Sequence, residues 1–294
     1  MRWIKVDSLR TDFLIEKRLS EFSPSLHGRV ESSIVALTGM LENFWSRFPT
    51  FTDHTILHSL DVLDYSNKIM GPFVDSLSAM ECYVLIMACY LHDIGMGVSQ
   101  KDYDEFSKEL DLSGYLREHP DADDKRIVRD FHNEFSGLFT RKYSELFDIP
   151  SEEAVFSIIQ LSRGHRKTDL FDEKEYPVLE TEEGIIRTAY LSAVIRLADE
   201  IDIAVDRNPE ILFDMPHLTL QADIDAFGTH ESIRRVDVFR DRIVLIQKPI
   251  EPRFRLLIQN LKEKVEKTLD YCSKVARERS DLRITQERVL LEEE

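Results

Sequence analysis

The chain has 294 residues, of which 43% are hydrophobic and 32% are charged, and its formal net charge is -17. This length is enough for one large domain, with or without an appendage, and the apolar fraction argues against extended disorder. The acidic balance excludes broad, non-specific binding to nucleic acid, which needs a basic face. A small basic pocket for one phosphate group is still compatible with it.

Three cysteines, Cys82, Cys89 and Cys272, fit neither a disulfide framework nor a cysteine-based zinc site. The first seven residues contain no signal-peptide core, and no apolar run is expected to approach membrane-spanning length. The sequence therefore predicts a soluble, cytoplasmic protein that does not use a membrane.

Helical periodicity dominates the chain as far as residue 207. Thr52 or Asp53 can cap a helix that runs through His58 to Met70. A central helix is expected where the sequence is apolar nearly all round, and Gly95 and Gly97 end it. The helices are predicted at residues 25–48, 53–70, 76–92, 104–118, 124–147, 151–164 and 182–207.

The pattern changes after Asn208-Pro209. Residues 218–224 and 234–247 alternate apolar and polar side chains, and the second run predicts a β-hairpin around Arg240-Asp241. A charged amphipathic helix follows at 253–279, and the acidic tail is expected to fray.

The predicted fold class is mainly α: a helical bundle with a small antiparallel β appendage and a long C-terminal helix. Residues 1–50 form an N-terminal helical segment packing on the core, residues 51–207 the main helical domain, and residues 208–294 the hairpin-and-helix appendage.

The doublet His92-Asp93 ends the central helix and places a nitrogen donor beside an oxygen donor, which suits a divalent transition metal. Two ligands are too few, and His58 and Asp199 offer others on strong helical patterns. His54 and His58 lie four residues apart and share one helix face. The prediction of a metal site depends on whether four side chains converge in the fold: His58, His92, Asp93 and Asp199.

Three segments, Thr52–Val62, Leu91–Gly95 and Arg196–Asp199, together resemble the HD superfamily of metal-dependent phosphohydrolases. The resemblance covers residues 50 to 207 and implies an all-helical HD domain. It implies that His58, His92, Asp93 and Asp199 bind a divalent transition metal. Because His and Asp ligands accept Mn, Fe, Ni, Co or Zn, the sequence leaves the identity of the metal open.

Two more histidines, His132 and His165, fall between the doublet and Asp199. Members of the superfamily with two metals, including the HD-GYP cyclic-dinucleotide phosphodiesterases, place additional histidines in this interval. The resemblance therefore implies a second ion at His132 and His165, with Asp93 as the bridge. In the alternative interpretation both histidines contact the substrate phosphate around one metal. In either case Asp93, His132 and His165 are the predicted catalytic residues.

The HD-GYP signature itself is incomplete, because only Tyr176-Pro177 follows His165 and Glu175 replaces the glycine. The segment Arg196–Arg207 is more similar to HD proteins that occur with Hsp90-like ATPase modules. No Gly-rich phosphate loop is present in this chain, so such an ATPase would be a separate partner.

Basic residues close to the proposed ligands could hold a substrate phosphate, since arginine offers a fork that matches phosphate oxygens. Equally, they could pair with the many carboxylates of an acidic chain. The predicted substrate-binding residues are Arg163, Arg166, Arg196 and His54.

The sequence thus predicts a metal-dependent phosphohydrolase acting on a nucleotide or related phosphoester. The alternatives are a nucleotide-sensing or partner-binding HD module with little catalysis, a cyclic-dinucleotide phosphodiesterase, and an HD-type single-strand nuclease. Extended nucleic acid is disfavoured by the charge, and homo-oligomerisation is left open.

Overall fold

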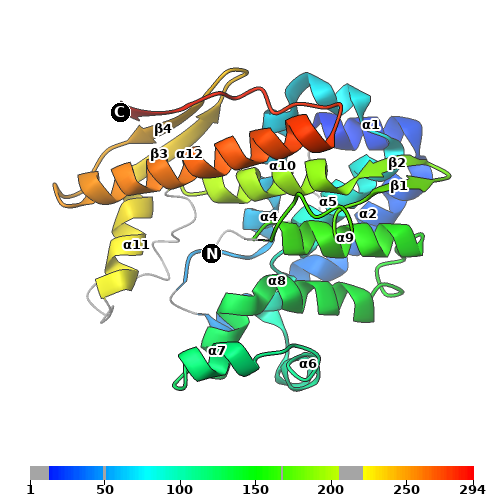
Figure 1. Cartoon of the computed structure of the whole chain (residues 1–294), viewed down its shortest axis with the longest axis horizontal. Coiled ribbons are helices and arrows are strands. Elements are labelled where there is room, and N and C mark those ends of the chain that lie inside the picture. The colour runs from blue at the N-terminus through cyan, green and yellow to red at the C-terminus, as the bar shows by residue number, and fades with distance from the viewer. Residues whose placement is uncertain (1–12, 49–50, 167, 205–220) are drawn as a thin grey trace.

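The computed structural model describes residues 13–48, 51–166, 168–204 and 221–294, and this part of the chain is mainly helical, as predicted. Figure 1 shows the helices stacked around a common centre, with the strands in two small sheets at the edges. The buried apolar side chains of these elements form one continuous core.

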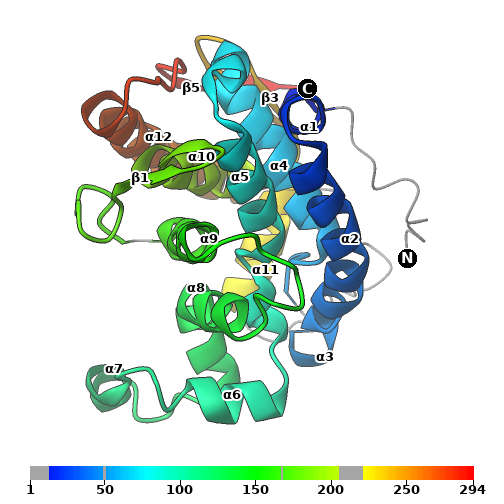
Figure 2. The same ribbon diagram turned by 90° about the vertical axis from the view of Figure 1, so that its right-hand side faces the viewer.

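Helix α5 (Ala79–Leu91) runs through the middle of the molecule (Figure 2) and is buried along its length. It begins where Ser78 and Glu81 cap each other's backbone in a reciprocal capping box, which satisfies two N–H groups at the helix start. By length and hydropathy alone Ala79–Gly97 is apolar enough to cross a membrane, contrary to our expectation. Since 94% of this window is buried inside the protein, its composition is that of a core helix.

The N-terminal helices α1 (Leu14–Phe22) and α2 (Pro24–Leu41) pack on α5. The helix predicted at 25–48 is interrupted, because α2 ends at Leu41 and the four-residue helix α3 (Phe44–Arg47) follows. Helix α4 (Ile56–Met70) starts after Thr55, whose side chain caps it, and continues into the 3-10 helix η2 (Gly71–Ser76).

A short 3-10 helix, η3 (Ile94–Gly97), follows α5 at the predicted glycines. The single helix predicted at 104–118 consists of two short ones, α6 (Gln100–Phe106) and α7 (Ser113–Glu118). Helices α8 (Asp124–Lys142) and α9 (Glu152–Gly164) then pack side by side, and α8 contains a break at Phe131.

The long helix predicted at 182–207 starts later than expected. A β-hairpin, β1 (Val178–Thr181) and β2 (Gly184–Arg187), precedes helix α10 (Thr188–Ile201). Gly184 has φ +115°, which other residues rarely adopt, and this turn closes the hairpin. Residues 205–207 of the prediction lie outside the described residues.

The C-terminal part confirms the hairpin, as β3 (Ile233–Val238) and β4 (Ile243–Gln247), and the long helix α12 (Phe254–Arg279). Two other expectations were wrong. The alternation at 218–224 does not mark a strand over residues 221–224, which begin helix α11 (Gln221–Ser232), while residues 218–220 lie outside the described part of the chain. The acidic tail is not frayed but forms β5 (Val289–Glu293), parallel to β4. The sheet is therefore mixed and not purely antiparallel.

Helix α12 lies along α10 (Figure 1), with its apolar stripe packed on that helix. Helix α10 in turn contacts α4, α9 and α5. The C-terminal helix therefore supports the one side of the bundle from which Asp199 projects.

Candidate metal centre

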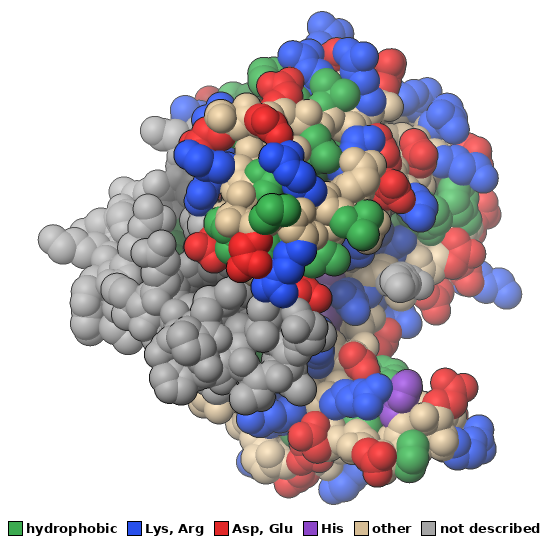
Figure 3. Space-filling view, turned by 90° about the vertical axis from the view of Figure 1, so that its left-hand side faces the viewer, with side chains coloured by type: hydrophobic (Ala, Val, Ile, Leu, Met, Phe, Trp, Pro, Cys, Tyr) green, Lys and Arg blue, Asp and Glu red, His purple; other side chains and the backbone are tan. Residues whose placement is uncertain are grey.

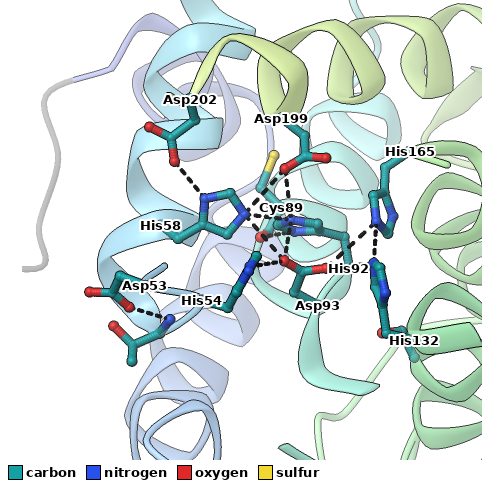
Figure 4. Close-up of polar contacts among 12 residues, drawn as sticks. Asp53, His54, His58, Cys89, His92, Asp93, His132, His165, Asp199 and Asp202 are labelled. Atoms are coloured by element: carbon teal, nitrogen blue, oxygen red, sulfur yellow. Dashed lines mark hydrogen bonds and ion pairs between the residues drawn. The ribbon is translucent and has the colours of Figure 1, made fainter. Parts of the chain in front are cut away.

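Three helices bring the four predicted ligands together. His58 lies on α4, His92 and Asp93 follow the last turn of α5, and Asp199 lies on α10. Their ligand atoms all lie within 4.8 Å of one another (Figure 4). We call these four residues the first ligand group.

The donor atoms of the first ligand group point at a common centre. Nε2 of His58 lies 3.3 Å from Oδ2 of Asp93 and 3.3 Å from Oδ1 of Asp199. Nε2 of His92 lies 3.4 Å from the same Asp93 oxygen. Two imidazole nitrogens and two carboxylates this close together are a donor set that suits a divalent transition metal.

A second ligand group, Asp93, His132 and His165, meets the same criterion. Oδ1 of Asp93 lies 3.3 Å from Nε2 of His132 and 3.6 Å from Nε2 of His165. Asp93 thus turns one oxygen to each group, and Figure 4 shows it between the two sets of side chains. The geometry fits a carboxylate that bridges two ions.

Two observations test whether metal ions fit these groups. Oδ1 of Asp93 is buried and accepts no hydrogen bond from the described residues, and such an oxygen is costly unless another charge satisfies it. The Nε2 atoms of His58 and His92 are 3.1 Å apart, and those of His132 and His165 are 3.0 Å apart. Without a cation, the two Nε2 lone pairs of each pair face each other. A cation held between them would accept both lone pairs.

The opposite nitrogen of each histidine is held by an oxygen, which fixes the ring. Since a carbonyl oxygen only accepts, Nδ1 must donate, and in the neutral ring this leaves the Nε2 lone pair for a metal. The bond from His58 reaches a carboxylate on the residue directly after α10. The four Nδ1 partners are Asp202 (2.5 Å from His58), the Cys89 carbonyl (2.9 Å from His92), the Arg129 carbonyl (2.6 Å from His132) and the Ser162 carbonyl (2.5 Å from His165).

The electrostatics of the site favour the ligand form of these side chains. Burial lowers the pKa of His132 and, more strongly, that of His165, so both rings are neutral at neutral pH. Burial alone would raise the pKa of Asp93, but His92 and His54 outweigh it and hold that pKa well below its usual range. The pKa of Asp199 is also lowered, because His58 and His165 outweigh its burial.

Two glycines allow the helices to approach closely enough for this geometry. A Cβ on Gly95 would lie 2.2 Å from the carbonyl oxygen of His132, and the Gly95 N–H donates to Oγ of Ser136. A Cβ on Gly164 would lie 2.7 Å from Cβ of Ser192 on α10. The first contact lets α8 pack closely against the segment that follows Asp93. The second lets the end of α9 pack closely against α10, the helix that carries Asp199.

The predicted substrate-binding residues differ in what their side chains contact. Nδ1 of His54 lies 2.8 Å from Oδ2 of Asp93, so His54 belongs to the edge of the first ligand group. Arg163 forms an ion pair with Glu134, and Arg196 donates to the carbonyls of Gly164 and Thr168.

Arg166 is exposed and forms no ion pair with the described residues. Thr168 also accepts a bond from Arg196 through its hydroxyl, so the guanidinium of Arg196 is committed to holding the segment after α9. Of the three arginines predicted to bind substrate, only Arg166 therefore has its guanidinium uncommitted within the described part of the chain.

Two contacts at the centre were missed from the sequence. The bond between Asp202 and His58 was not foreseen. The contact of His54 with Asp93 was not foreseen either. The spacing of four residues between His54 and His58 was the signal that could have indicated it.

Comparisons with known proteins agree with this geometry. No curated protein and no solved structure matches the chain. The profile of the family described as HD-CE matches residues 48–281, a span that contains every member of both ligand groups. The chain therefore belongs to the HD-CE family.

Proposed function

We propose that the protein is a metal-dependent phosphohydrolase acting on a nucleotide or a related phosphoester. One observation carries the proposal: the buried Asp93 carboxylate turns one oxygen to each of two histidine-containing groups and has an oxygen with no hydrogen bond from the described residues. Paired metal ions bridged in this way are suited to clamping a phosphate group.

The chain's own residues would hold and orient the reactants. His58, His92 and Asp199 would hold one ion, His132 and His165 the other, and Asp93 both. Bound divalent ions would lower the pKa of water and polarise a phosphoryl oxygen. The side chains of His54 and Asp199 are 19% and 22% exposed, so a substrate would approach the otherwise buried cluster from their side.

The alternative of a single-strand nuclease gains no support from the charge distribution. Figure 3 shows acidic and basic side chains interspersed over the described part of one face, without a broad basic area there. Binding of extended single strands uses a basic groove with aromatic platforms. We therefore favour a small phosphorylated molecule over a polymer as the substrate.

The proposal is tested by a turnover screen. The full chain is loaded with Mn(II) or Fe(II) and assayed for phosphate release from nucleotides, cyclic dinucleotides and simple phosphoesters. We expect turnover that disappears in the double variant with His92→Ala and Asp93→Ala. Metal bound without turnover of any of these compounds would overturn the proposal and favour a nucleotide-sensing or partner-binding module.

A further inference from the structure

Two arginines beside the second ligand group are not used by the metal centre. Arg129 lies on α8, three residues before His132, and Arg166 directly follows His165. Both side chains are exposed, and neither guanidinium forms an ion pair with the described residues. A role for these arginines in binding substrate rests on the proposed function.

The guanidinium of Arg129 is held in place by an aromatic ring. Its Cζ lies 4.8 Å from the ring centroid of Phe51, in the segment before α4. The Arg129 carbonyl accepts the Nδ1–H of His132, so its backbone is fixed directly to a predicted metal ligand. Stacking uses the face of a guanidinium and leaves the N–H groups at its edge free to donate.

Arg166 directly follows His165, a member of the second ligand group. Its positive charge contributes to the low pKa of His132, after burial, and also acts on Glu200 of α10. Its backbone N–H bonds to the Arg163 carbonyl at the end of α9, directly after His165. The backbone of Arg166 is therefore fixed directly after a member of the second ligand group.

Two neighbouring arginines, Arg163 and Arg196, have structural roles, because their guanidiniums are bound to other parts of the protein. Arg163 is paired with Glu134, and Arg196 donates to two carbonyls while its guanidinium lies over the ring of Tyr271. In contrast, neither Arg129 nor Arg166 has an ion pair with a carboxylate of the described residues, although the chain is rich in carboxylates. Two ions suffice for one phosphoryl group, so these extra positive charges point to a further anionic group on the substrate.

We propose that Arg129 and Arg166 bind a second phosphoryl group, one that is not at the metal centre during hydrolysis. The substrate class is then a nucleoside di- or triphosphate, or another small molecule with at least two phosphoryl groups. Phe51 is a positioning residue that orients Arg129.

The test compares matched substrates. KM and kcat are measured for adenosine and guanosine mono-, di- and triphosphates with the Mn(II)-loaded full chain and its R129Q and R166Q variants. We expect KM for the triphosphate to rise about tenfold or more in each variant, the value of one charged hydrogen bond, while KM for the monophosphate and kcat change little.

The matched control is R141Q, also on α8, where Arg141 pairs with Glu109 away from the centre. It removes the same charge and should leave every KM unchanged. F51L should raise KM for the triphosphate less than R129Q does, and F51Y, which keeps an aromatic ring, should behave as the wild type. Equal metal content in all variants confirms that the centre is intact.

The outcomes separate the two proposals. If the wild type hydrolyses phosphoesters but R129Q and R166Q leave the preference for triphosphate over monophosphate unchanged, the arginine assignment is overturned and the proposed function stands. If the wild type hydrolyses nothing, the proposed function fails. Calorimetric binding of a non-hydrolysable nucleoside triphosphate then decides the assignment: weaker binding in both variants supports it, and equal binding overturns it.

Discussion

The two ligand groups differ in how completely each could hold an ion by itself. The first has two histidines and two carboxylates from three helices, and one of its histidines is oriented by a further carboxylate, Asp202. The second has two histidines and only the shared oxygen of Asp93, and backbone carbonyls orient both rings. An ion in the first group should therefore bind without the second, whereas the second ion should depend on Asp93 being correctly held.

The largest effect is expected where the groups meet. D93N keeps the side-chain volume but removes the charge that both groups share, so both ions should be lost and phosphohydrolase activity with them. Elemental analysis of the purified variant should show a large loss of bound metal from the two ions per chain expected in the wild type. A circular dichroism spectrum equal to that of the wild type serves as the control for folding, and full metal content in D93N would refute the bridge.

A smaller effect is expected from breaking the second group alone. H165A removes one of its three ligands and leaves the first group untouched, so metal content should fall from two ions to one per chain. The measurement is elemental analysis combined with calorimetric titration of the remaining site. Loss of both ions in H165A would show that the first group does not hold its ion independently.

The Asp202 carboxylate, which contacts Nδ1 of His58, allows a test of the first ligand group alone. D202N weakens the partner of His58 Nδ1, so affinity at the first site should fall about 10–100-fold, while the second site changes less. Competition titrations with a metal chelator measure both affinities. D64N provides the matched control, because Asp64 lies on the same helix but pairs with Lys68, and its variant should bind metal as the wild type does.

The smallest effect concerns the spacing between the groups. G95A places a methyl group against the His132 carbonyl, so α8 should shift, with a loss of about 1–3 kcal/mol in the free energy of unfolding and weaker binding of the second ion. The control is G39A in α2, where nothing lies within 4 Å, and a gain of about 0.5–1 kcal/mol is expected. Urea denaturation measures the free energy of unfolding of both variants. Equal stability of G95A and the wild type would contradict the close approach of Gly95 to the His132 carbonyl.

Local patterns in the sequence were enough to predict the central helix and the candidate ligands of the first group, but not helices α1 and α11. The apolar run before His92 predicted the central helix, and the three motif segments singled out the four residues that the structure brings together as the first ligand group. His132 and His165 were found because they fall in the interval where related proteins carry extra histidines. The structure adds that they share Asp93 with the first group.

Features that depend on distant partners could not be read from the sequence. Strand β5 forms by pairing with β4 some way back in the chain, and its acidic residues by themselves indicate a frayed tail. Arg196 was chosen because it lies one turn before Asp199, but its direction is set by the carbonyls of Gly164 and Thr168. Likewise, only the packing of α8 against the segment before α4 brings Arg129 to Phe51.

The most direct test of the shared carboxylate is a crystal structure of the full chain soaked with Mn(II), with anomalous scattering recorded near the manganese edge. We expect two anomalous peaks about 3.5–4 Å apart, one on each oxygen of Asp93, with the higher occupancy between His58 and His92. A single peak confined to the first group, or no peak at Asp93, would contradict a two-ion centre built on this residue.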